Sequence, residues 1–289
     1  MKDYVIITDS TCDLPKNFTE ENNVEVITVP YSINGVVYDG KDKDMDIKDF
    51  YDSMRNGTMP TTMACNVADC SDVFRKYAEK NVDILYLAFS SGLSSTYGNG
   101  CIAANDIMEE YPECKITVVD TLAASMGEGL IVYYAVNLKK QGKSMDEVAS
   151  WVEAHKSEVI SRFTVNDLHH LHRGGRVSKT TAVVGTLINV KPVLHVDAEG
   201  CLKSLENVRG RKKSLTRLLD MMEESIRDYS GENHIAMLSH GDCEDDARFI
   251  ADEIKKRFGM DTMINILGQT IGTHTGPDLI ALFFMGNNR

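Results

Sequence analysis

The chain contains 289 residues, of which 43% are hydrophobic, and its 31 basic and 43 acidic side chains give a net charge of −12. This length favours two compact domains, which together bury enough surface to need no disulfide or metal ion for stability. The acidic charge argues against a general nucleic-acid or anionic-membrane surface, so we expect no nucleic-acid partner.

The N-terminal segment "MKDYVIITDS" has only a short apolar run and no cleavage site with small residues, so we expect no signal peptide. No apolar run approaches the length of a membrane span. The 7 cysteines include no C-x-x-C pair, which favours reduced and mostly buried thiols. The prediction is a cytoplasmic protein with no membrane span.

Strand-like apolar runs alternate with amphipathic helical segments along most of the chain, a pattern typical of α/β architecture. The dipeptide Asn34-Gly35 between apolar neighbours predicts a tight hairpin. One helix is predicted to begin after Asp46 and end near Gly57, and Ser144 with Glu147 predicts a capping box for another. The predicted strands cover residues 4–8, 24–33, 82–89, 115–120, 159–165, 234–239, 263–267 and 279–284.

No linker rich in proline or glycine marks a domain boundary. The best candidate lies near residue 158, where a predicted helix ends and a new strand begins. This division gives an N-terminal α/β domain, 1–158, with hydroxyl-rich loops, and a C-terminal α/β domain, 159–289, with a basic segment and a late histidine. A boundary without a linker indicates that the two domains pack closely.

A hydroxyl-rich loop, "SSGLSSTYGNG", leads from the strand at 82–89 into a helix. Free backbone N–H groups and the positive end of the helix dipole at such a place can bind an anionic group. Simple N-capping is the alternative, and it needs only one hydroxyl. Gly98 and Gly100 near the start of the helix favour close approach by another backbone or a ligand. The loop matches no phosphate-binding fingerprint.

Two further places carry candidate polar ligands. Thr61 and Thr62 follow Pro60 in a loop before a helix, and His274 stands in "GTHTGPD" before the last apolar run. Taken alone, each is ordinary loop chemistry. His169 and His172 share a helical face, but no third ligand lies at a metal-site spacing, so no metal site is expected.

Seven short motifs follow one another along most of the chain. They run from Thr8 to Asp278 and read "TDSTCDLP", "PTT", "SSGLSSTY", "VDTLAASMGEGL", "LHRGGRVSKTTAVVGTLINVKPVL", "VRGRKK" and "IGTHTGPD". Together they resemble the DegV family, the fatty-acid-binding proteins that serve as partners of bacterial fatty acid kinase. The chain departs from the family pattern at Met63-Ala64-Cys65, where Ser-Gln-Pro is common, and at Ser95 and Gly98, where Gly and Gln are usual.

The resemblance implies two closely packed α/β domains with one acyl chain buried between them. It implies that Thr62, Ser94 and His274 hold the carboxylate of the ligand, and Thr61 and Ser91 are neighbouring ligand-binding candidates. A buried carboxylate needs compensation because desolvation of an isolated anion is very costly. Hydroxyl groups, a helix N-terminus and one imidazole N–H can provide it without a permanent ion pair.

The resemblance also implies a carrier rather than an enzyme. The protein would bind a long-chain fatty acid and present its carboxylate to the ATP-binding subunit of fatty acid kinase, which makes acyl phosphate for phospholipid synthesis. No cofactor is expected besides the bound fatty acid, and transient exchange of lipid at a membrane surface is left open. Arg173 and Arg176 of "RGGR" and Arg209 and Arg211 of "VRGRKK" are implied to lie near the pocket mouth and contact the kinase.

The charge distribution is uneven. The segment from Arg173 to Arg217 has ten basic side chains, Lys179 among them, and three acidic ones, although the whole chain is acidic. A solvated face is the simpler interpretation of one charge run. A docking surface is the interpretation that the resemblance adds.

An enzyme is the alternative function, either a small-molecule kinase subunit or a serine hydrolase that uses Ser94 and His274. Hydrolysis requires an activated serine, an orienting group and an oxyanion hole. The sequence contains no G-x-S-x-G nucleophile elbow, so the carrier is the favoured prediction.

Overall fold

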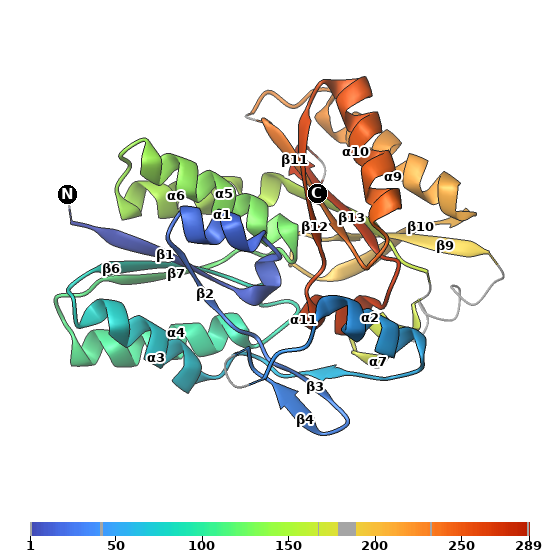
Figure 1. Ribbon diagram of the computed structural model, residues 1–289. Coiled ribbons are helices and arrows are strands. Elements are labelled where there is room, and N and C mark those ends of the chain that lie inside the picture. Colours follow the sequence, from blue (N-terminus) through green and yellow to red (C-terminus); the bar gives the residue numbers. More distant parts are fainter. Residues whose placement is uncertain (1, 41–42, 167, 179–188, 232, 288) are drawn as a thin grey trace.

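The computed structural model describes residues 2–40, 43–166, 168–178, 189–231, 233–287 and 289, and it forms two α/β halves with a small third sheet below them (Figure 1). The first sheet is parallel, in the order β2-β1-β6-β7. Its strands are β1 (Tyr4–Asp9), β2 (Val24–Ile27), β6 (Asp83–Ala88) and β7 (Ile116–Asp120). The helices around it are α1 (Lys16–Glu21), α3 (Val67–Ala78), α4 (Thr96–Glu110), α5 (Met126–Lys140) and α6 (Met145–His155).

The second sheet is mixed, in the order β10-β9-β8-β13-β11-β12, with only β11 and β12 parallel among the pairs described. Helices α9 (Arg211–Ile226) and α10 (Glu244–Phe258) pack on one face, and the short helices α7 (His169–Arg173) and α11 (Gln269–Thr275) lie at one end (Figure 1). The strands are β8 (Val159–Thr164), β9 (Val190–Val196), β10 (Leu202–Arg209), β11 (Ile235–His240), β12 (Asp261–Ile266) and β13 (Ile280–Met285).

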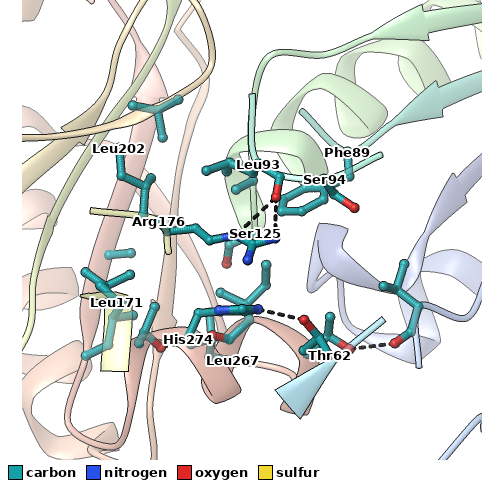
Figure 2. Close-up of a pocket in the computed structure, with 18 of the residues that line it drawn as sticks. Thr62, Phe89, Leu93, Ser94, Ser125, Leu171, Arg176, Leu202, Leu267 and His274 are labelled. Atoms are coloured by element: carbon teal, nitrogen blue, oxygen red, sulfur yellow. Dashed lines mark hydrogen bonds between the residues drawn. The ribbon is translucent and has the colours of Figure 1, made fainter. Parts of the chain in front are cut away.

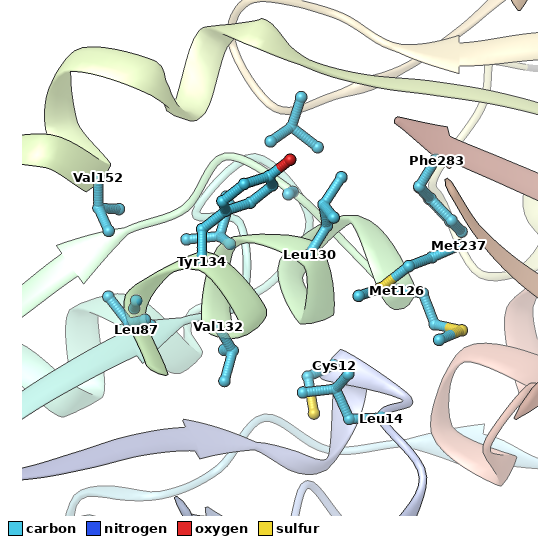
Figure 3. Close-up of a cluster of buried hydrophobic side chains, with 14 of the residues drawn as sticks. Cys12, Leu14, Leu87, Met126, Leu130, Val132, Tyr134, Val152, Met237 and Phe283 are labelled. Carbon is cyan, nitrogen blue, oxygen red and sulfur yellow. The ribbon is translucent and has the colours of Figure 1, made fainter. Parts of the chain in front are cut away.

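Helix α5 joins the two halves (Figure 3). Met126, Met237 and Phe283 belong to one buried hydrophobic cluster that spans both sheets. A methyl group at Gly127 would overlap the Phe283 ring, so glycine allows the helix to lie directly on the second sheet. The extensive apolar burial explains why no linker separates the halves.

The third sheet has the order β4-β3-β5, with β3 (Tyr31–Ile33), β4 (Val36–Tyr38) and β5 (Thr61–Thr62). Helix α2 (Ile47–Arg55) lies between β4 and β5 in the chain. The single strand predicted at 24–33 is wrong, because the chain leaves the first sheet after Ile27 and Pro30 precedes β3. The predicted hairpin is confirmed: Asn34 and Gly35 have φ values of 51° and 80° and connect β3 to β4.

Both predicted helix starts are confirmed. The Asp46 carboxylate accepts the N–H groups of Lys48 and Asp49, and Ser144 and Glu147 form the reciprocal capping box. The division near residue 158 stays a prediction. Lys179 lies outside the described residues. Within the described ranges, no helix combines the length and the apolar character that a bilayer crossing requires.

Candidate functional site

A cavity of about 220 Å³ lies between the two halves (Figure 2). Phe89 and Leu93, which follow β6, form part of its wall, and the second sheet contributes Phe163 and Phe283. Helix α11 adds Ile271. These side chains make most of the wall apolar, so the cavity suits a hydrocarbon better than a sugar or a nucleotide.

Polar side chains gather at one part of this wall. Thr62 of β5 and His274 of α11 are 212 positions apart in the chain, yet Thr62 Oγ1 lies 2.7 Å from His274 Nε2 (Figure 2). Both residues line the cavity. The small third sheet therefore brings the "PTT" loop into contact with the late histidine.

The His274 imidazole is neutral at pH 7. Burial lowers its pKa to about 4, and the nearby cations Arg176 and Arg173 add to this shift. Its Nδ1 atom is buried without a hydrogen-bond partner. Burying an unpaired lone pair costs less free energy than burying an unpaired N–H group. The proton therefore belongs on Nε2, which donates to Thr62, and the Thr62 hydroxyl hydrogen can point into the cavity.

Ser94 offers a second hydroxyl in the same way. Its Oγ accepts the N–H of Thr96 at 3.2 Å and lies 2.9 Å from Thr96 Oγ1. If the Thr96 hydroxyl donates to Ser94, the Ser94 hydroxyl hydrogen is free to donate to a ligand. The N-cap residue of α4 is Ser95, which makes no side-chain cap bond. Ser94, one residue earlier, accepts the N–H of the first helical residue and also lines the cavity, so its hydroxyl can serve the helix start and a ligand together.

Arg176 brings positive charge to the cavity. Its Nε and Nη2 donate to the Leu93 carbonyl at 3.1 and 2.6 Å, and its Nη1 donates to the Gly174 carbonyl. Among the described residues, no carboxylate forms an ion pair with it. Burial lowers the pKa of the guanidinium, which still remains a cation at neutral pH. An anionic ligand would compensate this charge.

Arg173 holds the loops around the polar end. Its Nη2 donates to the carbonyls of Pro60 and Thr273, and its Nη1 contacts the sulfur of Met59. It thereby connects α7, the segment before β5, and α11. A methyl group at Gly174 would overlap the His274 ring, so the turn after α7 also fixes the imidazole.

The remaining predicted residues lie elsewhere. Thr61 and Ser91 are exposed and do not line the cavity. Arg209 and the cavity residue Leu202 lie at opposite ends of β10, roughly 23 Å apart at the usual rise of a strand. Arg211 forms a 2.8 Å ion pair with Asp246. The structure therefore brings together Thr62, Ser94, His274 and Arg176. Thr61, Ser91, Arg209 and Arg211 lie outside the cavity wall.

Within the described part of the chain, no group of three or more His, Cys, Asp or Glu side chains is arranged to hold a metal ion. The cavity combines hydroxyl groups and one cation near one part with apolar side chains around the rest. The exposed fraction of Met63, a wall residue, is 41%, so the polar end lies close to solvent.

The DegV family model matches residues 3–287. The chain belongs to the DegV family. A DegV domain-containing protein of Clostridium perfringens is 40% identical over 100% of this chain and 99% of its own length. A fatty-acid-binding DegV family protein from Thermus thermophilus has 29% identity and a TM-score of 0.86, with 98% of this chain and 99% of that chain covered. DegV of Bacillus subtilis, a fatty acid binding protein, has 25% identity and a TM-score of 0.85, with 99% and 100% covered.

The departures of this DegV protein from the family motifs lie around the polar end. Met63 and Ala64 line the cavity, and the Cys65 N–H donates to Thr96 Oγ1 at 3.3 Å, so the segment still joins the two hydroxyl loops. Gly100 accommodates the ring of Tyr86 rather than a ligand, because a methyl group there would overlap that ring. Apart from its chain neighbours and the nearby backbone of α4, a methyl group at Gly98 would meet no atom within 4 Å.

Sequence reasoning missed one cavity residue of special geometry, Ser125. It precedes α5 with φ 54° and ψ −146°, a conformation that residues with a side chain rarely adopt. The sequence signal for it is the "VDTLAASMGEGL" motif, which contains Ser125. Strain of this kind gathers at functional sites.

Proposed function

We propose that this DegV protein binds a long-chain fatty acid in the cavity between its halves, with the carboxylate at the end formed by Thr62, Ser94, His274 and Arg176. The protein acts in the cytoplasm as a carrier without a cofactor. It presents the carboxylate to the ATP-binding subunit of a fatty acid kinase, which converts it to acyl phosphate for phospholipid synthesis.

One observation carries the proposal. At one end of an otherwise apolar cavity, the Thr62 and Ser94 hydroxyl groups can each donate a hydrogen bond, and Arg176 has no carboxylate partner among the described residues. A fatty acid has the complementary shape and charge. Its acyl chain gains about 0.8 kcal/mol per buried CH₂ group. Its carboxylate accepts charge-assisted hydrogen bonds in place of water. The related proteins of Thermus thermophilus and Bacillus subtilis bind fatty acids, which supports the same ligand here.

The kinase role rests on the position of the polar end. A carboxylate near the partly exposed Met63 would be within reach of a second protein that brings ATP. Arg173 and Arg176 lie at this end, where a guanidinium can also hold a transferring phosphoryl group. Exposed Arg209 lies farther away, so its role is limited to electrostatic steering of the partner.

The experiment is extraction of the purified, denatured protein followed by mass spectrometry for acyl chains. We expect about one long-chain fatty acid per chain, and recovery of binding when the stripped protein is given oleic acid. Ser94→Ala and His274→Ala protein from the same preparation should retain less, with His169→Ala as the matched histidine control. Extracts without any acyl species, together with no binding on re-addition, contradict the proposal.

A serine hydrolase is less well supported. It would need the Ser94 hydroxyl activated by His274. Instead, Ser94 shares its hydrogen bond with Thr96, and His274 contacts Thr62. Absence of hydrolysis of a p-nitrophenyl acyl ester by the lipid-free protein would separate the two functions.

A further inference from the structure

Three buried carboxyl groups gather where β1 ends and α5 begins. Asp9, Asp13 and Glu128 are 0%, 6% and 0% exposed. Among the residues that the structure describes, no basic side chain forms an ion pair with any of them. Buried carboxylates without a cation are costly, so each one present needs a compensating set of hydrogen bonds.

Two of the three are compensated from within the N-terminal half. Asp9 accepts the N–H of Phe89 at 3.0 Å, the Tyr86 hydroxyl at 3.2 Å and the N–H of Thr11 at 3.1 Å. Glu128 accepts the hydroxyls of Thr8 and Thr11 at 2.7 and 3.0 Å. Their contacts stabilise the end of β1 against α5 and do not reach the second sheet.

Asp13 has a different set of partners. Its Oδ1 accepts the N–H of Gly268 at 2.9 Å, and its backbone carbonyl accepts Asn265 Nδ2 at 2.8 Å; both partners lie in the C-terminal half. Its Oδ2 accepts the hydroxyl of Ser125 at 2.6 Å, and Ser125 Oγ lies 2.8 Å from Ser239 Oγ at the end of β11. Asp13 is therefore bonded across the boundary between the halves.

These partners lie at the beginnings of the two helices that border the cavity. Ser125 is the N-cap residue of α5, and Gly268 is the N-cap residue of α11, which carries His274. Ser125 and the neighbouring Leu267 both line the cavity. A methyl group at Gly268 would press on the Asp13 carboxylate, so the contact is close. A movement of α11 away from α5 must break the bonds of Asp13.

We infer that Asp13 is a positioning residue that locks the two halves together beside the cavity, and that release of this lock is the step that lets a bound acyl chain leave. The inference rests on the proposed function for the identity of the ligand. The lock itself is a property of the contacts between the halves.

Ionisation weakens the lock. Burial raises the pKa of Asp13 to about 7, against the hydrogen bonds from Ser125 and Gly268, and the charge of Asp9 raises it further. Glu128, Cys12 and Tyr51 are the other titratable groups that interact with it. The closed form holds the proton more tightly than an open, hydrated form, whose carboxyl has an ordinary pKa near 4. This contribution to closure is therefore fully present below about pH 4 and is lost as pH rises to about 7.

The test follows transfer of a fluorescent long-chain fatty acid from the full-length protein to phosphatidylcholine vesicles. Asp13→Ala should release it about tenfold faster, because it removes the acceptor of both the Gly268 N–H and the Ser125 hydroxyl. Ser239→Ala, a milder change, should release it about threefold faster. Glu128→Gln is the matched control. Among the described residues this buried carboxyl forms hydrogen bonds only within the N-terminal half, so the release rate of the variant should equal that of the parent. The parent rate should rise between pH 5 and pH 7 and level off above pH 7, whereas the Asp13→Ala rate should stay flat.

Hydrogen exchange of the ligand-free protein separates this inference from the proposed function. Asp13→Ala and Ser239→Ala should accelerate exchange at residues 265–274 even if no fatty acid binds. Parent-like exchange there in both variants, or parent-like release from a protein that binds fatty acid, overturns the lock and leaves the carrier function intact. A parent that binds no fatty acid overturns the carrier function and leaves the exchange result as the test of the lock.

Discussion

The protein contains two buried polar regions, the carboxyl cluster and the polar end of the cavity, which differ in how completely their polar atoms are hydrogen-bonded. In the carboxyl cluster, each side-chain oxygen of Asp9, Asp13 and Glu128 accepts at least one hydrogen bond. At the polar end of the cavity, His274 Nδ1 has no partner and Arg176 has no carboxylate among the described residues. Buried polar groups whose hydrogen bonds are all made indicate a role in stabilising the fold. Buried polar groups without a partner indicate a place where a ligand can bind.

The largest effect should come from the satisfied region. Asp9→Ala removes the acceptor of the Phe89 and Thr11 N–H groups and of the Tyr86 hydroxyl, all buried. Since each buried donor left without a partner costs about 1–3 kcal/mol, the free energy of unfolding should fall by about 3 kcal/mol or more. Urea unfolding of lipid-free protein measures it. A loss below about 1 kcal/mol would mean that water replaces the carboxylate.

The cavity should show the opposite response. Thr62→Val keeps the shape but removes the hydroxyl proposed to donate to the ligand, so fatty-acid binding should weaken by about 1–3 kcal/mol. Stability of the lipid-free protein should change by less than about 1 kcal/mol. Titration with oleic acid measures the affinity, and urea unfolding measures the stability of the lipid-free protein. His169→Ala serves as the control. Parent-like affinity would remove Thr62 from the site.

An intermediate effect concerns pH. Because His274 has a folded pKa of about 4 and an ordinary value near 6.5, the unfolded chain binds more protons between these values, and stability falls as pH falls through this window. From pH 7 to pH 5.5 the contribution is about 1 kcal/mol. The difference in unfolding free energy between the parent and His274→Gln should shrink accordingly. A difference independent of pH would show an imidazole that titrates normally.

The smallest effect is expected at Arg209, which is exposed at the far end of β10. Arg209→Ala should leave fatty-acid content and affinity within about twofold of the parent, because surface charges contribute little at this distance. Acyl phosphate formation with the kinase should slow modestly, and the difference should vanish at high salt. If Arg209→Ala and the parent gave equal turnover at all salt concentrations, the basic segment would be a solvated surface without a role in docking.

Local signals in the sequence determined much of the fold. The Asn34-Gly35 hairpin and the caps at Asp46 and Ser144 depend on neighbouring residues alone, and all three are confirmed. The strands β9 and β10 were missed, since β10 is an edge strand with several exposed positions and lacks a clear apolar pattern. Whether such a segment forms a strand depends on the neighbouring strands of the sheet, which include segments distant in the chain.

For the site, the sequence by itself determined which hydroxyl-rich loops and which late histidine were candidates. Only the tertiary structure decided that Thr62 contacts His274, that Arg176 lies in the cavity wall, and that Thr61 and Ser91 do not. The physical reason is that a cavity is made by side chains from several elements whose packing is set by the whole core. Composition and spacing report each element separately, whereas the contact between β5 and α11 exists only once both halves have closed around the same space.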